Sequence, residues 1–592
     1  MVSRGNVWNG SALAVTAILP LIGGCGGNKI DGFSNEDWSR IEAIAPMSTK
    51  MPDNQFDVMA GNTAFAKFGQ RLFFDKRGAE GITVDGPSGK APYQPIDPAT
   101  GKPAVDSTGK AIIVPGETGK VGCVTCHGSP YWVESRPFPL SHGRNWLQHN
   151  TPTMVNTGYL ESVLWTGRFD SLREHGAGAM GAAATTLAQM HFIYTYYKDQ
   201  YNALFPGTVF DPNAPQNQTT GMSPFEPGAT DAARFPATAN AKGAATVNGK
   251  TVMGADGVFE KMALADQREA NNFKGNMGIV FEAHPRQLNT PNSPFELYVT
   301  KQDSTMISES AKNGLRLFIG KASCLDCHNG PALSDNQFHN IGVPTPMGFP
   351  PGSATPATPD RGHGGVLAAQ LNNQLMNLRT NDMISDQNQQ VPIFGGAGQY
   401  SDSPTAGRQR LVDLDAQLCT TRSTSMDDVT AACQALFYPG APEDDTKTPP
   451  VPAKPADARL ALCIAANTAT GVSICTKYAD SEEGAFRTPT LLNVAMTGPY
   501  FHTGMYNTLR DVVVHYNQGG APTGTFVGTK SARIRPLGLT DQEIDDLVEF
   551  LKTLTGDLPA VDWSCDPSLP TVPDGQKSIS MGACAASALT AP

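Results

Sequence analysis

The 592-residue sequence lacks long apolar runs, clusters of basic residues and clear strand signals. No apolar run reaches the ~18 residues that a transmembrane helix needs, so we expect no such helix. Charged residues make up only 17%, the net charge is −11, and Lys and Arg do not cluster. This balance argues against nucleic acid as the main partner.

Glycine and proline, in contrast, are abundant, with 60 and 46 residues respectively. Hydrophobic residues make up 40% of the chain, which is enough to build sizeable cores at this length. The composition therefore predicts a globular protein with many irregular connections, and it excludes a disordered acidic chain.

The N-terminus has the features of an export signal. Arg4 supplies positive charge, residues 11–22 are mostly apolar, and Leu21-Ile-Gly-Gly-Cys25 resembles a bacterial lipobox. We predict a signal peptide at residues 1–24, an acylated Cys25, and a periplasmic or outer-membrane-anchored lipoprotein. The alternative is an ordinary signal peptide in which Cys25 is incidental.

Two Cys-x-x-Cys-His motifs are the strongest chemical signal. They comprise Cys123, Cys126 and His127, and Cys324, Cys327 and His328. The thiols of such a motif bond to haem and the adjacent histidine ligates the iron. The alternatives are a redox dithiol or half of a zinc site. Neither explains why a histidine directly follows the cysteine pair in both motifs. We predict two covalent haem c groups.

Six of the eleven cysteines belong neither to these motifs nor to the signal. An even number in an exported protein predicts disulfides. We expect neighbours in sequence to pair, and the alternative is that some are free and buried. The expected pairs are Cys419–Cys433, Cys463–Cys475 and Cys565–Cys584.

Helical patterns flank the motifs. Residues 65–74 and 311–318 show helical spacing before each motif. Thr540 and Glu543 form a capping box before an apolar helical stripe, which we expect Gly556 to close. The fold class predicted is mainly α, with two cytochrome c-like haem domains and long irregular insertions.

Several longer stretches resemble the bacterial di-haem cytochrome c peroxidase and MauG family. They cover roughly half of the chain, in family order: residues 69–75, the first haem motif, 150–153, 164–172, the second haem motif, 336–342, 486–504 and 508–513. The rest reads as insertions at 78–120, 206–256 and 344–483. We expect domains at 50–300 and 301–560, the second with a disulfide-rich insertion at 344–483, and a tail at 561–592.

The resemblance implies the iron ligands. His127 and His328 are the expected proximal ligands. His142 matches the distal histidine of the N-terminal haem, or is a surface residue. Tyr516, counted from His502, takes the distal position of the C-terminal haem as in MauG, or only packs beside that haem. A tyrosinate ligand would favour ferric iron.

The resemblance also implies which residues lie between the haems and which partners the protein has. Trp165 matches the tryptophan that lies between them. Asn150 and the carbonyls of Thr497 and Pro499 match a calcium site, and oxygen ligands suit that ion. The implied partners are hydrogen peroxide and a small redox protein (cytochrome c or cupredoxin) or a substrate protein. A lipid anchor and a homodimer complete these expectations.

The sequence departs from the family at the distal pocket of the N-terminal haem. The peroxidases place a Gln and then a Glu there, and the Glu moves a proton during O–O cleavage. His175 and Thr185 occupy these positions, and no acidic residue lies between Glu174 and Asp199. His175 is either a substitute base or a filler.

Three functions therefore compete. The first is an exported oxidase that reduces peroxide at the N-terminal haem with electrons from the C-terminal haem. The second is an electron-transfer or oxygen-binding cytochrome, which the missing Glu favours. The third is an oxygenase of similar layout, which no particular residue supports. The resemblance favours the peroxidase-type enzyme.

Overall fold

The structure is a computed structural model. It describes residues 29–45, 61–78, 122–128, 131–133, 147–169, 171–179, 183–206, 261–346, 360–364 and 483–567, with shorter pieces between these ranges and Cys584. His142, Cys433 and Cys463 lie outside the described residues, as do Cys25 and the rest of the predicted signal. Within the described part, no helix is both long and apolar enough to cross a membrane.

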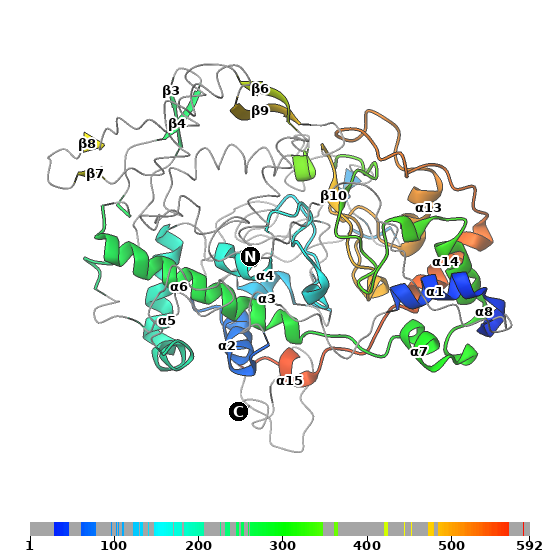
Figure 1. The fold of residues 1–592 in the computed structure, drawn as a ribbon, viewed down its shortest axis with the longest axis horizontal. Coiled ribbons are helices and arrows are strands. Elements are labelled where there is room, and N and C mark those ends of the chain that lie inside the picture. Colours follow the sequence, from blue (N-terminus) through cyan, green and yellow to red (C-terminus); the bar gives the residue numbers. More distant parts are fainter. Residues whose placement is uncertain are drawn as a thin grey trace, which may run out of the picture.

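Helices dominate the described residues (Figure 1). The α-helices are α1 Asn35–Ile44, α2 Thr63–Phe74, α3 Cys123–Cys126, α4 Leu172–Ala179, α5 Ala183–Leu204, α6 Leu264–Ala283, α7 Pro294–Lys301, α8 Glu309–Ile319, α13 Leu509–Asn517, α14 Asp541–Lys552 and α15 Val561–Ser564. Short 3-10 turns lie at η1 Ile30–Gly32, η2 Thr157–Tyr159, η3 Pro285–Gln287, η4 Ser304–Met306, η5 Cys324–Asp326 and η6 Val494–Met496.

The strands form two-stranded antiparallel pairs. They are β1 Ile96–Asp97 with β2 Lys102–Pro103, β3 Ala244–Val247 with β4 Lys250–Met253, β5 Phe338–His339 with β10 Phe486–Arg487, β6 Cys419–Ser423 with β9 Val472–Tyr478, and β7 Glu443–Asp444 with β8 Val451–Pro452. The mainly helical fold class is confirmed for the described residues.

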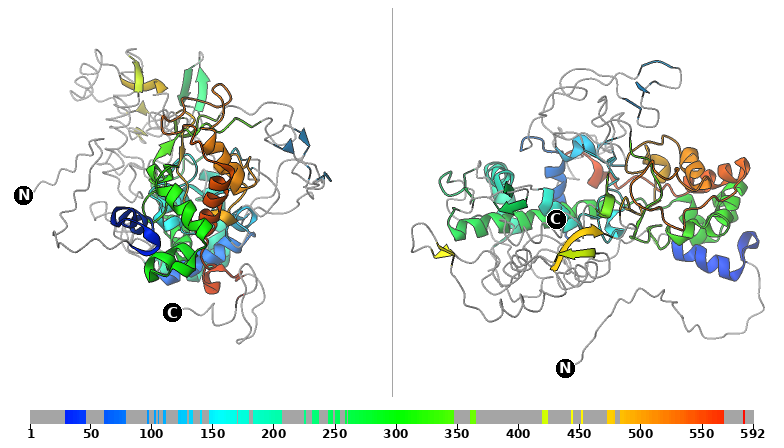
Figure 2. Two further views of the ribbon diagram at one scale, coloured as in Figure 1. Left: turned by 90° about the vertical axis from the view of Figure 1, so that its right-hand side faces the viewer. Right: turned by 90° about the horizontal axis from the view of Figure 1, so that it is seen from above.

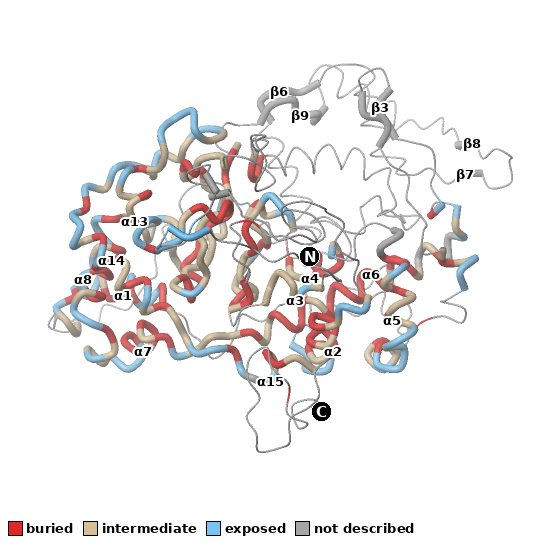
Figure 3. Tube along the Cα trace, turned by 180° about the vertical axis from the view of Figure 1, so that it is seen from behind, coloured by how far each residue is buried: buried red, intermediate tan, exposed pale blue. Residues whose placement is uncertain are grey.

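Two hydrophobic cores lie toward opposite ends of the long axis (Figures 1 and 2). One is built by α2, α5 and α6, and contains Phe65, Tyr201 and Phe273. The other is built by α1, α7, α8, α13 and α14, and contains Trp38 and Phe550. Figure 3 shows buried residues concentrated along these helices. Helix α1 thus precedes the first core in the chain but packs in the second.

A glycine lets the entry helix of each core approach its partner. A Cβ atom on Gly69 of α2 would lie 2.4 Å from the carbonyl oxygen of Val280 in α6. One on Gly314 of α8 would lie 2.0 Å from the carbonyl oxygen of Asp546 in α14. Both distances are far below van der Waals contact, so only glycine allows these crossings.

The predicted helices are confirmed, with one correction. Thr540 caps α14 and forms the expected capping box with Glu543. However, α14 ends at Lys552, with Thr553 at its C-cap, so Gly556 does not close the helix. Instead, a Cβ on Gly556 would lie 2.3 Å from the carbonyl oxygen of Thr290, which indicates that close packing requires this glycine.

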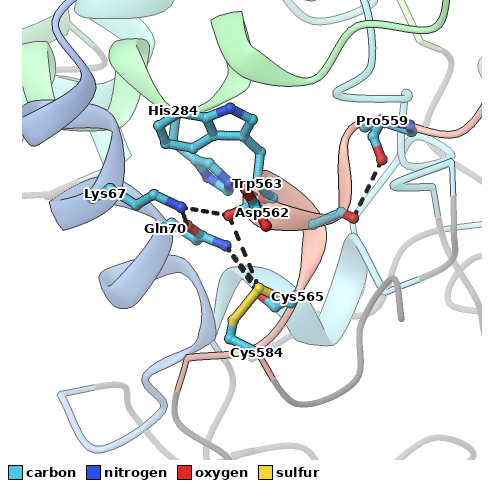
Figure 4. Close-up of a disulfide and its surroundings, with 9 residues drawn as sticks. Lys67, Gln70, His284, Pro559, Asp562, Trp563, Cys565 and Cys584 are labelled. Carbon is cyan, nitrogen blue, oxygen red and sulfur yellow. Dashed lines mark hydrogen bonds between the residues drawn. A yellow bond between two sulfur atoms is a disulfide. The ribbon is translucent and has the colours of Figure 1, made fainter. Parts of the chain in front are cut away.

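The C-terminal segment returns to the first core (Figure 4). A disulfide joins Cys565 to Cys584, as predicted. Gln70 of α2 donates to the Cys565 carbonyl oxygen at 2.9 Å, and the Lys67 ammonium lies 4.1 Å from the ring centre of Trp563. The tail therefore fastens the end of the chain to the entry helix of the first core.

Candidate haem sites

The first haem motif begins in the short helix α3. Cys123 and Cys126 are not joined in a disulfide. Nδ1 of His127 lies 3.0 Å from the carbonyl oxygen of Trp132. Since a carbonyl only accepts, Nδ1 must donate, and the lone pair of the neutral ring remains on Nε2. This tautomer presents Nε2 to a metal ion.

The second motif repeats this arrangement. Cys324 and Cys327 are free, and Nδ1 of His328 lies 2.9 Å from the carbonyl oxygen of Leu333. Burial lowers the pKa of both His127 and His328, which favours the neutral, metal-binding form. The two motifs therefore carry the same donor set in the same protonation state.

Tyr516 of α13 lies beside the second motif. Burial, followed by the nearby Cys327 and Cys324, raises the pKa of Tyr516 far above its usual value. Its hydroxyl makes no hydrogen bond to any described residue. Neighbouring His515 is fully engaged, because Nδ1 lies 3.2 Å from the Tyr506 hydroxyl and Nε2 lies 3.0 Å from the Ile341 carbonyl oxygen. Of these two neighbours, Tyr516 is the one free to ligate.

His175 of α4 lies close enough to His127 to feel its charge. Burial, then His127 and Arg168, lowers the pKa of His175 to about 4, so the ring is neutral near pH 7. The ring packs against Phe169 at 5.3 Å between centres and makes no side-chain hydrogen bond to a described residue. A neutral imidazole with free nitrogens can accept a proton. Thr185 lies in α5, but the description does not extend to its side chain.

Trp165 lies at the junction of the two halves. Its Nε1–H donates to the carbonyl oxygen of Asn150 at 2.8 Å. The backbone N–H of Asn150 donates in turn to the carbonyl oxygen of His502 at 2.7 Å. The His502 ring stacks on Phe486 at 3.5 Å, and its centre is 6.4 Å from that of Trp165. This contact places Asn150 against the loop that contains Thr497 and Pro499.

Sequence reasoning missed a polar pair beside this junction. Nε2 of His149 lies 2.5 Å from a carboxylate oxygen of Asp360, and this bond lowers the pKa of Asp360 against the raising effect of burial. Asp360 lies inside the predicted 344–483 insertion. No sequence motif around it marks it as a partner of His149. A pocket opens beside the pair, lined by Gln148, Thr345, Phe486, His502 and Thr503 among others.

His363 also ties the insertion to the first half. Its Nδ1 donates to the Thr166 carbonyl oxygen at 2.8 Å, and its ring stacks on Phe338 at 3.6 Å. Gly167, with φ of +63°, leaves room for this stack, since a Cβ there would lie 2.2 Å from the Phe338 ring. Residues 360–364 therefore contact both halves.

The environment of Arg487 shows whether the site is suited to a cofactor that carries carboxylates. Its guanidinium is buried and donates to the carbonyl oxygens of Leu164 and Thr488, each at 3.2 Å. Burial lowers the pKa of Arg487 to about 10. No described residue offers it a carboxylate. A buried cation without an anionic partner fits a cofactor that carries carboxylates, as haem does.

Cys327, Asp335 and His339 offer ligand atoms that all lie within 4.8 Å of one another. Cys327 belongs to the haem motif, so its sulfur is expected to bond to the porphyrin. We therefore interpret the group as part of the second haem site.

The chain is similar to known cytochrome-c peroxidases. Residues 116–242 match the sequence model of the family described as di-haem cytochrome c peroxidase. The cytochrome-c peroxidase IdrP1 of Denitromonas iodatirespirans is 25% identical over 464 residues, which cover 76% of this chain and 80% of that protein. The resemblance inferred from the sequence is confirmed, and the chain is similar to peroxidase-type haem oxidoreductases.

A further relative and a solved structure are also similar to the chain. The methylamine utilization protein MauG of Methylorubrum extorquens is 35% identical over 260 residues, which cover 43% of this chain and 56% of that protein. The solved structure of the diheme peroxidase BthA from Burkholderia thailandensis shares 16% identity, with a TM-score of 0.42, and covers 90% of this chain and 94% of that chain.

Proposed function

We propose that the protein is an exported di-haem oxidoreductase that reduces hydrogen peroxide at its N-terminal haem. The observation that carries the proposal is the repeated donor set, in which two cysteines outside any disulfide accompany a histidine whose Nδ1 is held by a carbonyl. Residues 50–300 and 301–560 would form the two haem domains. Bound haem would supply the redox-active iron at both sites.

The protein's own residues orient and connect these sites. His127 and His328 would ligate the two irons in the proximal role, and Tyr516 would ligate the iron of the C-terminal haem in the distal role. Trp165, held by the Asn150 carbonyl, lies on the electron route between the haems. The external electron source is a small redox protein or a substrate protein.

Calcium is a further part of the proposal. Asn150 and the carbonyls of Thr497 and Pro499 would supply oxygen ligands, and the Asn150–His502 backbone bond supports their proximity. Acylation of Cys25, anchoring at the outer membrane and homodimer formation also belong to the proposal.

His175 is the proposed proton acceptor for peroxide. Its neutral ring, its position near His127 and its unbonded nitrogens support this role. The alternative is an electron-transfer cytochrome, favoured by the absence of any acidic residue between Glu174 and Asp199.

The test is peroxide turnover by the calcium-loaded, half-reduced protein, after pyridine haemochrome has established two haems per chain. A positioned general acid–base contributes roughly 10²–10⁴-fold in rate, and the carboxylate that supplies it in the peroxidases is absent here, so we expect slow turnover. Thr185→Glu should raise the rate and His175→Ala should lower it. High turnover that ignores both changes would contradict the assigned pocket. Absent turnover with reversible reduction of both haems would favour the electron-transfer cytochrome.

A further inference from the structure

A short sequence pattern occurs once in each half. Thr153-Met-Val-Asn156 follows the first haem motif, and Thr490-Leu-Leu-Asn493 follows the second. Both asparagines adopt left-handed backbone angles, with φ of 59° and 61°, at the start of the 3-10 turns η2 and η6. The repeat therefore extends to backbone conformation.

In the first half, the pattern supports the turn that holds His127. The Thr153 hydroxyl donates to the carbonyl oxygen of Tyr131 at 2.7 Å, next to the Trp132 carbonyl that accepts from His127. The same hydroxyl oxygen accepts from the backbone N–H of Val155 at 3.0 Å. Trp132 itself is held at φ of 57°.

In the second half, equivalent bonds support the turn that holds His328. The Thr490 hydroxyl donates to the Ala332 carbonyl oxygen at 2.7 Å, next to the Leu333 carbonyl that accepts from His328. It also accepts from the backbone N–H of Leu492 at 3.1 Å. Leu333, like Trp132, has a positive φ, of 49°.

The hydrogen bonds of the two halves meet at the hydroxyl oxygen of Thr290. The side-chain amide of Asn156 donates to the hydroxyl oxygen of Thr290 at 2.6 Å, and that of Asn493 donates to the same oxygen at 2.8 Å. Asn156 also accepts from the Thr290 backbone N–H at 3.2 Å, and Asn493 from that of Gly556 at 3.0 Å. Both asparagines are buried, so water does not replace these bonds.

We propose that Thr290 is a positioning residue that couples the two proximal histidines, and therefore makes the redox state of one haem felt at the other. The Nδ1–H of a ligated imidazole donates more strongly as positive charge on its metal rises. Each such bond ends on a turn braced by a threonine, Thr153 or Thr490. The asparagine three residues after each threonine donates to the Thr290 oxygen. A displacement of Asn156 therefore changes the strength of the Asn493–Thr290 hydrogen bond, and a displacement of Asn493 changes that of the Asn156–Thr290 bond.

The inference rests on the proposed function in requiring two bound haems, but it does not require peroxide. The experiment is an absorbance-monitored potentiometric titration of the protein with both haems attached. In the wild type, we expect the potential of each haem to depend on the oxidation state of the other. Thr290→Val removes the shared acceptor at nearly constant volume, and we expect it to abolish this dependence.

Thr555→Val is the matched control, because the Thr555 hydroxyl is buried and has no hydrogen-bond partner among the described residues. It should leave the dependence intact, and Thr290→Ser, which keeps the oxygen, should retain it. If Thr290→Val does not load both haems, Thr290→Ala replaces it in the same titration. Independent haems in the wild type, unchanged coupling in both hydroxyl-free variants, or equal loss in the control would overturn the inference. Fewer than two haems per chain in the wild type would instead contradict the proposed function.

Discussion

Tyr516 and His515 are neighbours with opposite hydrogen-bonding states, and this contrast decides between them as iron ligands. Both His515 nitrogens are bonded, whereas the Tyr516 hydroxyl is free of bonds to described residues and lies near Cys324 and Cys327. Burial raises the pKa of Tyr516, so without a metal the phenol stays protonated. Ligation must therefore release its proton.

Tyr516→Met should raise the potential of the C-terminal haem. A neutral thioether replaces an anionic oxygen that stabilises ferric iron. Potentiometry with the ferric spectrum measures the change. His515→Gln is the control and should leave the spectrum as it is. An unchanged potential in Tyr516→Met would assign the ligand elsewhere, with buried Met505 next in line.

Helix α8 depends on a single glycine for its crossing with α14. Gly→Ala inside a helix normally stabilises it by about 1 kcal/mol. At Gly314 the added methyl would meet the Asp546 backbone, and overpacking of this kind costs roughly 1–3 kcal/mol. We expect Gly314→Ala to lower the melting temperature and to displace the helix that precedes the second haem motif.

Asn313→Ala provides the comparison, since this exposed residue lies on the same helix turn. Thermal unfolding followed by circular dichroism should show a loss for Gly314→Ala and little change for Asn313→Ala. Equal melting temperatures would show that the two helices can separate without cost.

Local signals explain which elements could be predicted. The entry helices and α14 follow from apolar spacing and a threonine cap, which act within a few residues. The motif histidines follow from covalent haem chemistry. The packing of α1 on the second core and the His149–Asp360 pair depend on contacts between residues far apart in the chain. Gly556 was assigned wrongly because close packing and helix capping both select glycine.

The tail packs against the first core, and His284, which bonds to the tail, makes this packing sensitive to acid. Nε2 of His284 lies 3.0 Å from the Trp563 carbonyl oxygen and must donate, while Nδ1 is buried and has no hydrogen-bond partner in the part of the chain that the structure describes. Burial, opposed by this bond and aided by Lys67, lowers the pKa of His284 to about 4. The unfolded chain would take up the same proton near pH 6.5.

Between pH 6.5 and 4 the unfolded state binds a proton that the folded state does not, so stability falls as the pH falls. The full difference is about 3 kcal/mol. His284→Gln should flatten this acid slope in unfolding measurements across the range. Parallel slopes for wild type and His284→Gln would assign the acid sensitivity to other groups.

Two points far apart in the chain, at residues 361–362 and 483–485, lie side by side. Gly362 pairs with Ala485, and Arg361 forms an ion pair with Glu483, so the chain leaves and returns at adjacent points. The entropy of closing such a loop grows only with the logarithm of its length. A change in the number of residues between these two points would therefore carry only a small entropic cost, while Arg361 and Gly362 keep their contacts with Glu483 and Ala485.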